Sequence, residues 1–449
     1  MTASKCIGSA RTLAILLNAG LAASLASAQQ AAPAEPAQTP APKEALKFGE
    51  LPKNTGWLVD PEAAPANFFE ALLGKVHLND RLRFEFAETD GRKPSYAFTN
   101  RLRLGYETRS WEGFSGMVEM ENVASIDTDL YFVPGTDHGD PDRTVIADPT
   151  GTEINQAWGR YHTKGLFDTD ASLDLKVGRQ RIILDNARFV GNVGWRQFEQ
   201  TFDAARVDLG SGPFSLTYAY FWHVQRIFSD EGVNWDANSH LVRGSWKAAD
   251  WLTVIPFVYL FDFEQSPLDS SDNFGVRLTG SVSLNEDKTT TIIYEATYAH
   301  QSDAGNNPVD YDADYFEVDL ALAVKDVGTL GAGFEYLGSD DGAIGFRFPE
   351  GTNHAFNGYA DLFLVTPPEG LQDFYVYAKT DLPWGVKGAA YFHQFWFAEG
   401  GDDIGWEVDG VLTKSISRNW SVLAKVAYFD GQGRFRDTVR AWLETTFSF

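Results

Sequence analysis

The chain has 449 residues, a formal net charge of −25 and 14% aromatic residues. The acidic balance argues against nucleic acid as a partner, because surfaces that bind nucleic acid are basic. The single cysteine, Cys6, lies near the N-terminus, so neither disulfides nor cysteine-bound metals are expected in the rest of the chain.

The first segment, residues 1–28, has the features of a secretory signal peptide. Lys5 and Arg11 give it a basic start, a short apolar run follows, and Ala26–Ala28 is typical of a cleavage site. The apolar run is too short to span a membrane. We therefore expect the mature chain to begin at Gln29.

The next segment, residues 29–75, is expected to be a periplasmic leader and a transition to the folded domain. Its first part, residues 29–45, is rich in Ala and Pro, which predicts a disordered or polyproline-like stretch. Near its end, Phe69–Leu73 is expected to form one helical turn.

From residue 76 onward, apolar and polar residues alternate in segments long enough to cross a membrane as strands. Arg81–Phe86 places charged residues at odd positions and apolar residues at even positions, and Arg101–Glu107 repeats the pattern. A membrane strand needs roughly 9–11 residues. One face of each strand would suit lipid and the other would suit water.

The C-terminal segment Thr438–Phe449 alternates to its last residue and ends on an aromatic side chain. A chain that stops on an aromatic residue on the apolar phase of a strand is typical of an outer-membrane β-barrel. We expect the apolar face to contact outer-membrane lipid and Phe449 to be recognised by the barrel-assembly machinery.

Connections between the predicted strands fall into two alternating classes. Short turns such as Gly210–Pro213 alternate with long loops such as 182–201 and 339–370, the arrangement of short periplasmic turns and long external loops. About nineteen segments resemble strands, but both chain ends in the periplasm require an even number, so we exclude residues 355–365.

These features predict an all-β fold, a transmembrane antiparallel β-barrel of about 18 strands over residues 76–449. Its long extracellular loops are expected to fold partly into the lumen, which should be wide enough for an aqueous channel. The alternative is a soluble all-β protein such as a propeller, but no repeat with a period of roughly 40–50 residues is present.

Arginine is frequent on the predicted lumen phase in the first part of the barrel, and acidic residues dominate much of the remainder. An arginine ladder would attract anionic solutes and bind their carboxylates bidentately. The alternative is that any water-facing wall is polar and roughly balanced. The candidate lumen arginines are Arg81, Arg83, Arg101, Arg103, Arg243 and Arg277.

The densest polar stretch runs from Gly178 to Arg206. We expect it to fold back into the channel as a constriction, with its guanidinium groups held by Asp185 and Asp203. The alternative is a structural loop whose Arg–Asp pairs brace the barrel mouth. The candidate constriction residues are Arg179, Arg181, Asp185, Asn186, Arg188, Trp195, Arg196, Gln197, Asp203 and Arg206.

At this stretch the chain resembles the alginate export family of outer-membrane barrels. The similarity is carried by Gly178–Gln180, Asp185-Asn186, Arg188-Phe189, Gly191, Trp195–Gln197 and Phe202–Ala204. A second similar patch, in the predicted loop 339–370, contains His354, Asn357 and Asp361. The resemblance implies an outer-membrane porin of about eighteen strands whose arginine-lined lumen passes a polyanionic polysaccharide of uronic acids. By position, it implies Arg179, Arg181, Arg188, Arg196 and Arg206 as pore residues.

The sequence as a whole favours a passive porin in the outer membrane of a Gram-negative bacterium. Its cargo would be anionic, either sugar acids or acidic oligosaccharides and polysaccharides, and neither a cofactor nor a catalysed reaction is expected. Three alternatives stay open. They are a general or cation-preferring diffusion porin, a barrel enzyme that acts on lipid or glycan, and a structural or adhesive barrel.

Overall fold

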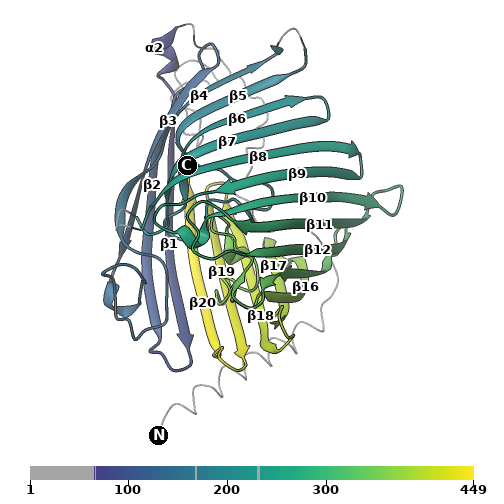
Figure 1. Cartoon of the computed structure of the whole chain (residues 1–449). Coiled ribbons are helices and arrows are strands. Elements are labelled where there is room, and N and C mark those ends of the chain that lie inside the picture. The colour runs from purple at the N-terminus through teal and green to yellow at the C-terminus, as the bar shows by residue number, and fades with distance from the viewer. Residues whose placement is uncertain (1–64, 66, 167–168, 230–232) are drawn as a thin grey trace.

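A computed structural model describes residues 65, 67–166, 169–229 and 233–449 of the chain (Figure 1). The expected signal peptide and most of the expected leader and transition segment, residues 29–75, lie outside these residues. The described part of the chain contains no helix long and apolar enough to cross a membrane.

One antiparallel sheet of 18 strands closes on itself, because β1 pairs with β2 on one side and with the C-terminal β20 on the other. The predicted fold class and strand number are confirmed. The barrel strands are β1 (Lys75–Thr89), β2 (Ser95–Glu107), β3 (Phe114–Ser125), β4 (Gly151–Lys164), β5 (Ser172–Gln180), β6 (Thr201–Ser211), β7 (Phe214–Gln225), β8 (Trp235–Ala249), β9 (Leu252–Phe261), β10 (Ser271–Ser283), β11 (Thr290–Asp303), β12 (Asp312–Val324), β13 (Gly328–Leu337), β16 (Leu371–Leu382), β17 (Val386–Trp396), β18 (Asp403–Ser417), β19 (Trp420–Gly431) and β20 (Thr438–Ser448).

The remaining described elements are short. Helix α2 (Phe68–Ala71) forms close to the predicted turn, and the Asn67 side chain caps it by accepting a hydrogen bond from the Glu70 backbone N–H at 3.0 Å. The others are the hairpin strands β14 (Ser339–Asp340) and β15 (Ile344–Gly345) and the 3-10 turns η1 (Thr128–Leu130), η3 (Pro267–Asp269), η4 (Asn353–Ala355) and η5 (Pro383–Gly385).

The two faces of the barrel follow the period-two alternation of the strands. On β2, the outward side chains of Phe98, Leu102 and Leu104 are exposed, whereas the inward side chains of Arg101 and Arg103 are buried. An apolar outer face matches the lipid hydrocarbon, and the polar face is turned to the interior.

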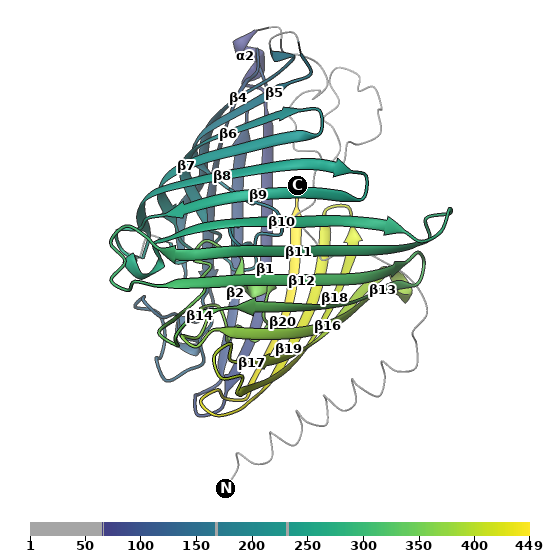
Figure 2. The ribbon, with the colours of Figure 1, turned by 45° about the vertical axis from the view of Figure 1, so that its right-hand side comes forward.

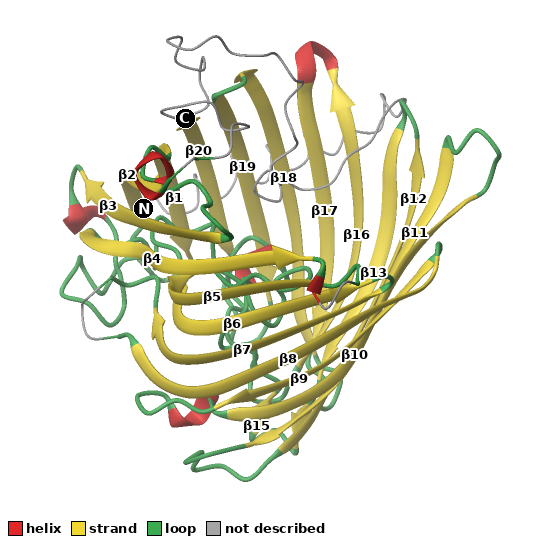
Figure 3. Cartoon of the chain, turned by 90° about the horizontal axis from the view of Figure 1, so that it is seen from above, coloured by secondary structure: helices red, strands yellow, loops and turns green. Residues whose placement is uncertain are grey.

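Short turns lie at one end of the barrel and the longer loops at the other (Figure 2). Residues 355–365 form no barrel strand and belong to the long connection between β13 and β16, as the strand count requires. Seen along the barrel, loop segments cross the space inside the ring of strands (Figure 3). We call them the 126–150, 181–200 and 338–370 loops.

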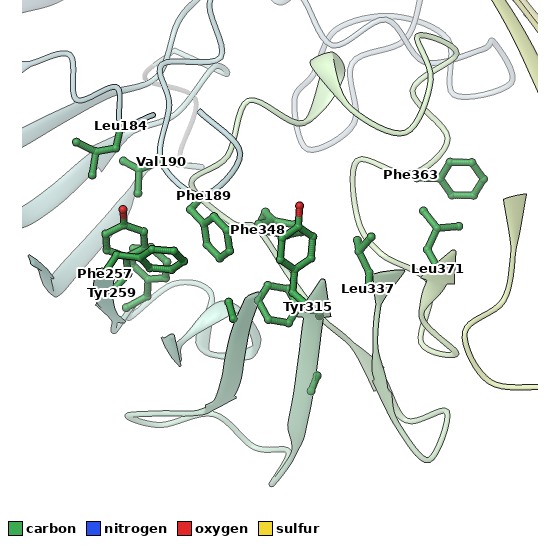
Figure 4. Close-up of a cluster of buried hydrophobic side chains, with 14 of the residues drawn as sticks. Leu184, Phe189, Val190, Phe257, Tyr259, Tyr315, Leu337, Phe348, Phe363 and Leu371 are labelled. Atoms are coloured by element: carbon green, nitrogen blue, oxygen red, sulfur yellow. The ribbon is translucent and has the colours of Figure 1, made fainter. Parts of the chain in front are cut away.

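Apolar side chains of the inserted loops pack against inward-facing residues of the strands (Figure 4). The Phe189 ring of the 181–200 loop lies 4.8 Å from the Phe257 ring of β9 and 5.6 Å from the Tyr315 ring of β12. It also lies 4.9 Å from the Phe348 ring of the 338–370 loop. At this level the lumen is filled by a packed core rather than by the open channel expected from the strand number.

Candidate functional site

The 181–200 and 338–370 loops are joined to each other through their backbones. The Gly191 N–H donates to the Glu350 carbonyl at 2.8 Å, and the Thr352 N–H donates to the Ala187 carbonyl at 2.9 Å. Backbone groups in a barrel lumen need partners when water is excluded, and each loop supplies them to the other. The two loops therefore form one unit across the lumen.

Arg188 anchors this unit to the barrel wall. Its Nε donates to Glu335 Oε1 of β13 at 2.7 Å, and its Nη2 donates to Asn357 Oδ1 of the 338–370 loop at 2.7 Å. The guanidinium also lies 3.9 Å from the Phe348 ring centroid. Burial by itself would lower the pKa of Arg188, but the Glu335 carboxylate outweighs this and raises the pKa, so Arg188 stays charged.

A second anchor joins Arg196 of one loop to Asp361 of the other. Arg196 Nη2 donates to Asp361 Oδ2 at 2.5 Å. His354 Nδ1 lies 2.6 Å from Asp361 Oδ1, and Lys425 Nζ of β19 lies 2.9 Å from His354 Nε2. The His354 ring stacks on Trp195 with centroids 4.5 Å apart and planes 2° apart.

Burial determines the protonation state of His354. Burial lowers the pKa of His354 well below its usual value, an effect that outweighs the Asp361 carboxylate. The neutral ring then donates from Nδ1 to Asp361 and accepts at Nε2 from the Lys425 ammonium. His354 is thus a bridge between a buried carboxylate and a buried ammonium.

The arginines of β1 and β2 form a patch beneath the 181–200 loop. Arg81 and Arg101 are directly opposite each other in the strand register. Arg81 guanidinium N–H groups donate to the carbonyls of Trp195 at 3.1 Å and Gly194 at 3.0 Å, and Arg83 pairs with Glu444 at 2.7 Å. The loop therefore covers this arginine patch and is bound by it.

Some donors of this patch have no hydrogen-bond partner within the described part of the chain. They are Nε of Arg81, Nε and Nη1 of Arg101 and Nη2 of Arg103. Arg81 Nε lies 3.6 Å from Glu444, Arg101 Nε lies 3.8 Å from Glu121, and Arg103 Nη2 lies 3.4 Å from Glu199. Buried donors are normally satisfied, so these N–H groups mark a place that favours an acceptor.

Every candidate arginine forms an ion pair, and the two acids expected from the sequence take part, Asp203 with Arg179 and Asp185 with Arg243. Partly exposed Arg181 contacts Glu119 at 2.9 Å and Glu199 at 2.5 Å. Burial would raise the pKa of Glu199, but Arg103 and Arg181 lower it to about 2. The other pairs are Arg81–Glu444, Arg83–Asp148, Arg101–Glu121, Arg103–Glu121, Arg179–Asp203, Arg188–Glu335, Arg196–Asp361, Arg206–Asp208, Arg243–Asp185 and Arg277–Glu295.

Two polar residues of the 181–200 loop contact other parts of the barrel. The Gln197 backbone N–H donates to Asp148 of the 126–150 loop at 2.8 Å, and its side chain donates to Thr99 at 2.7 Å. Asn186 donates to Glu295 of β11 at 3.0 Å. The 126–150 loop thus joins the same assembly, and Asp148 is a residue that the sequence reasoning missed.

The placement of Arg179 and Asp203 in the pore was wrong. On β5, Arg179 lies on the same phase as Leu175 and Val177, whose side chains are exposed on the outer face. Asp203 is directly opposite Arg179 on β6, and the two pair at 2.8 Å. The alternation around Leu175 and Val177 is the signal that would have assigned them to the outside.

The expected role of Asp185 also needs correction. It does not hold a guanidinium of its own loop, but pairs with Arg243 of β8 at 2.5 Å. Arg206 is on the inward phase of β6, where it contacts Asp208 at 2.7 Å. The Asp185–Arg243 pair attaches the 181–200 loop to β8, whereas the Arg206–Asp208 pair lies within β6. The polar stretch from Gly178 to Arg206 therefore contributes both to loop attachment and to the barrel wall.

The opposite side of the lumen is acidic. Glu317 of β12 lies directly opposite Glu335 of β13, and Glu295 of β11 is opposite Asp319 of β12. The described part of the chain holds no group of three or more His, Cys, Asp or Glu side chains arranged to bind a metal ion. Together with the arginines of β1 and β2, the acidic residues of β11 to β13 give the lumen an arginine-rich side and a carboxylate-rich side.

Comparisons with known proteins agree with this architecture. A family model described as alginate export matches residues 75–324. The fold is similar to Acinetobacter baumannii OccAB4 and to Pseudomonas aeruginosa OccK1 (OpdK), each with a TM-score of 0.63 and 12% identity over 83% of this chain and 98% of the other. It is also similar to Pseudomonas aeruginosa OpdK with vanillate, at a TM-score of 0.63 and 13% identity over 83% and 98%. No curated protein matches significantly.

Proposed function

This chain belongs to the alginate export family and is a β-barrel of the Gram-negative outer membrane, and from that premise we propose that it is a passive channel for anionic solutes. The cargo class is sugar acids and acidic oligosaccharides or polysaccharides. Passage through the barrel involves no chemical reaction and no cofactor.

The observation that carries this proposal is the arginine patch on β1 and β2. Arg81 and Arg101 face each other across the strand pair, and the Nε–H of each has no hydrogen-bond partner among the described residues, although their other N–H groups include ones that donate. A guanidinium presents its donors in a fork that matches a carboxylate. Rings and rows of such groups set the selectivity of pores.

The inserted loops determine how a solute reaches the patch. Arg81 and Arg181 keep part of their side chains accessible, with 13% and 22% exposed, whereas Arg101 and Arg103 are buried. A solute would therefore meet Arg81 and Arg181, whereas Arg101 and Arg103 would act on it only through their charge. Pseudomonas aeruginosa OpdK, a barrel of similar fold, has a crystal structure with vanillate.

Liposome swelling tests this function with three solutes of matched size. Glucuronate, glucose and glucosamine share a pyranose ring and differ in charge. The proposal predicts the fastest swelling with glucuronate and the slowest with glucosamine. Equal rates for all three, or an inverted order, would contradict anionic specificity.

The acidic wall favours a second candidate, a cation-preferring diffusion porin. Glu317 and Glu335 are adjacent in register, and Glu407 and Asp409 share the inward phase of β18. Carboxylate rings are the usual device of cation channels. In the same liposome assay this candidate predicts that glucosamine enters fastest.

A further inference from the structure

Three tyrosines and one lysine share the inward face of two neighbouring strands. Tyr375, Tyr377 and Lys379 alternate along β16 with outward residues such as Phe374, and Tyr391 of β17 is directly opposite Tyr377. The Tyr375 and Tyr377 ring centroids are 6.3 Å apart, and those of Tyr377 and Tyr391 are 5.8 Å apart. All four side chains are half-buried, so part of each remains accessible.

The rings of Tyr375 and Tyr377 lie flat against the wall because β13 carries glycine beneath them. Gly331 is opposite Tyr377 in the register, and Gly333 is opposite Tyr375. A Cβ at Gly331 would lie 2.3 Å from Tyr377 Cζ, and one at Gly333 would lie 2.2 Å from Tyr375 Cζ. A side chain at either position would therefore force the tyrosine ring to shift from its present place.

The Tyr377 hydroxyl fixes its ring in this flat orientation. It donates to Asp319 Oδ1 of β12 at 2.9 Å, so the side chain reaches from β16 across the whole width of β13. The ring therefore has one face on the backbone of β13, and the other face is turned toward the lumen.

Lys379 supplies a cation at the edge of this aromatic surface. Its Nζ lies 4.5 Å from the Tyr377 ring centroid and 5.7 Å from that of Tyr391. Within the described ranges Lys379 forms no ion pair, in contrast to every candidate arginine of the lumen. Its ammonium is thus held by aromatic faces and is available to an anion.

We propose that Tyr375, Tyr377, Tyr391 and Lys379 form a binding subsite for a six-membered ring that carries one carboxylate. The ring packs on the flat tyrosine surface and the carboxylate pairs with the Lys379 ammonium. This inference rests on the proposed function and names the solute class that the channel takes.

The subsite also adjoins the inserted loops. The Tyr359 ring of the 338–370 loop meets the Tyr391 ring edge-on, with centroids 5.6 Å apart and planes at 72°. The Tyr359 ring centroid in turn lies 3.8 Å from Lys425 Nζ, and this ammonium contacts His354. The tyrosine surface is therefore connected through Tyr359, Lys425 and His354 to the Arg196–Asp361 anchor.

Binding is measured on the purified full chain in detergent by saturation-transfer NMR titration. The probes are glucuronate, glucose and benzoate, which separate the contributions of the ring, the carboxylate and aromaticity. Tyr377→Leu and Gly331→Ala remove or displace the flat ring, and we expect about fivefold weaker glucuronate binding, the size of one lost aromatic contact. The affinities of the unaltered chain for glucuronate and benzoate are then compared. Tighter binding of glucuronate indicates a sugar ring as the natural ligand, and tighter binding of benzoate indicates an aromatic ring.

Lys379→Gln tests the charge separately from the fold. It should weaken glucuronate and benzoate binding and leave glucose binding unchanged. Gly159→Ala is the matched control for Gly331→Ala, since a Cβ at Gly159 meets no atom within 4 Å. Heat-modifiable gel mobility establishes that each variant has formed a barrel.

Unchanged glucuronate affinity in folded Tyr377→Leu and Lys379→Gln would overturn the subsite. If these variants bind normally while liposomes still prefer glucuronate, the subsite is wrong and the proposed function stands. If the unaltered chain admits no anion preferentially, the proposed function fails, whatever the tyrosine surface binds.

Discussion

Arg196 in the 181–200 loop and Asp361 in the 338–370 loop form an ion pair of 2.5 Å, with side chains only 3% and 1% exposed. The Asp361 carboxylate also accepts from His354, so both of its oxygens are occupied. Burial would raise the pKa of Asp361, but His354 and Arg196 hold it well below its usual value. Two loops far apart in the sequence thus lock each other inside the barrel.

Arg196→Leu should release this lock. The substitution leaves the Asp361 charge without its guanidinium, and removal of one partner of a buried pair typically costs about 3–5 kcal/mol. We expect a larger and more variable single-channel conductance in planar bilayers, because the loops no longer fill the lumen. Lys93→Ala, which removes an exposed pair with Asp140, is the control and should leave the conductance unchanged. If the single-channel conductances of Arg196→Leu had the same distribution as those of the unaltered protein, the Arg196–Asp361 pair would not hold the loops in the lumen.

The buried Glu350 should make the loops sensitive to pH. Burial raises its pKa to about 8 from an ordinary 4.5, with Arg226 lowering it and Asp269 raising it. Between these two values the folded state keeps a proton that the unfolded state has lost, so the contribution to stability is complete below about 4.5 and is lost as pH rises through about 8. Glu350→Gln should therefore reduce the fall in thermal stability between pH 5 and pH 9. An identical pH dependence in the variant would exclude Glu350 as the cause.

Anion preference should depend on inward arginines and not on outward ones. Arg81→Gln removes a lumen charge, and Arg179→Gln removes a paired charge from the outer face. A single charge about 8 Å from a permeating ion in water contributes about 0.5 kcal/mol, which corresponds to about a twofold change in the ratio of anion to cation permeability. Reversal potentials should shift toward the cation side for Arg81→Gln alone. Equal shifts in both variants would show that net charge, rather than position, governs selectivity.

Phe449 should be needed for barrel assembly. Its backbone N–H donates to the Leu78 carbonyl at 2.8 Å and its carbonyl accepts from the Leu78 N–H at 3.0 Å, so it ends the seam between β20 and β1. We expect deletion of Phe449 to lower the amount of heat-modifiable barrel in the outer membrane, because both the seam and the proposed signal for the assembly machinery are lost. Phe449→Tyr, which keeps the backbone and the aromatic ring, should assemble normally. Full assembly of the deleted form would contradict this role.

The strands and turns could be predicted from the sequence because lipid and water impose a strict alternation. Arg101 and Leu102 on β2, for example, face opposite sides as the pattern requires. The requirement for an even number of strands excluded residues 355–365 from the predicted barrel strands. These residues resemble a strand in sequence but lie in a loop. The alternation is a local property of each strand, and the parity depends only on the number of strands. Both can therefore be read from a single sequence.

The contacts of the inserted loops could not be predicted, since they join residues that no local pattern connects. Arg188 pairs with Glu335 although 147 positions separate them, and Asp185 pairs with Arg243 of β8. The alternation along β13 places Glu335 on the inward face, but it gives no information on which loop side chain contacts it. Arg179 is a different case, because it belongs to the polar motif expected in the pore, whereas the phase of β5 places it on the outer face.

The most direct test of the central claim is the zero-current potential of the unaltered protein in a planar bilayer under a KCl gradient. If the guanidinium groups of β1 and β2 dominate the permeation path, the potential has the sign of chloride selectivity. A potential with the sign of potassium selectivity would mean that the carboxylates of β11 to β13 and β18 govern the channel, and the proposal of anionic cargo would be rejected.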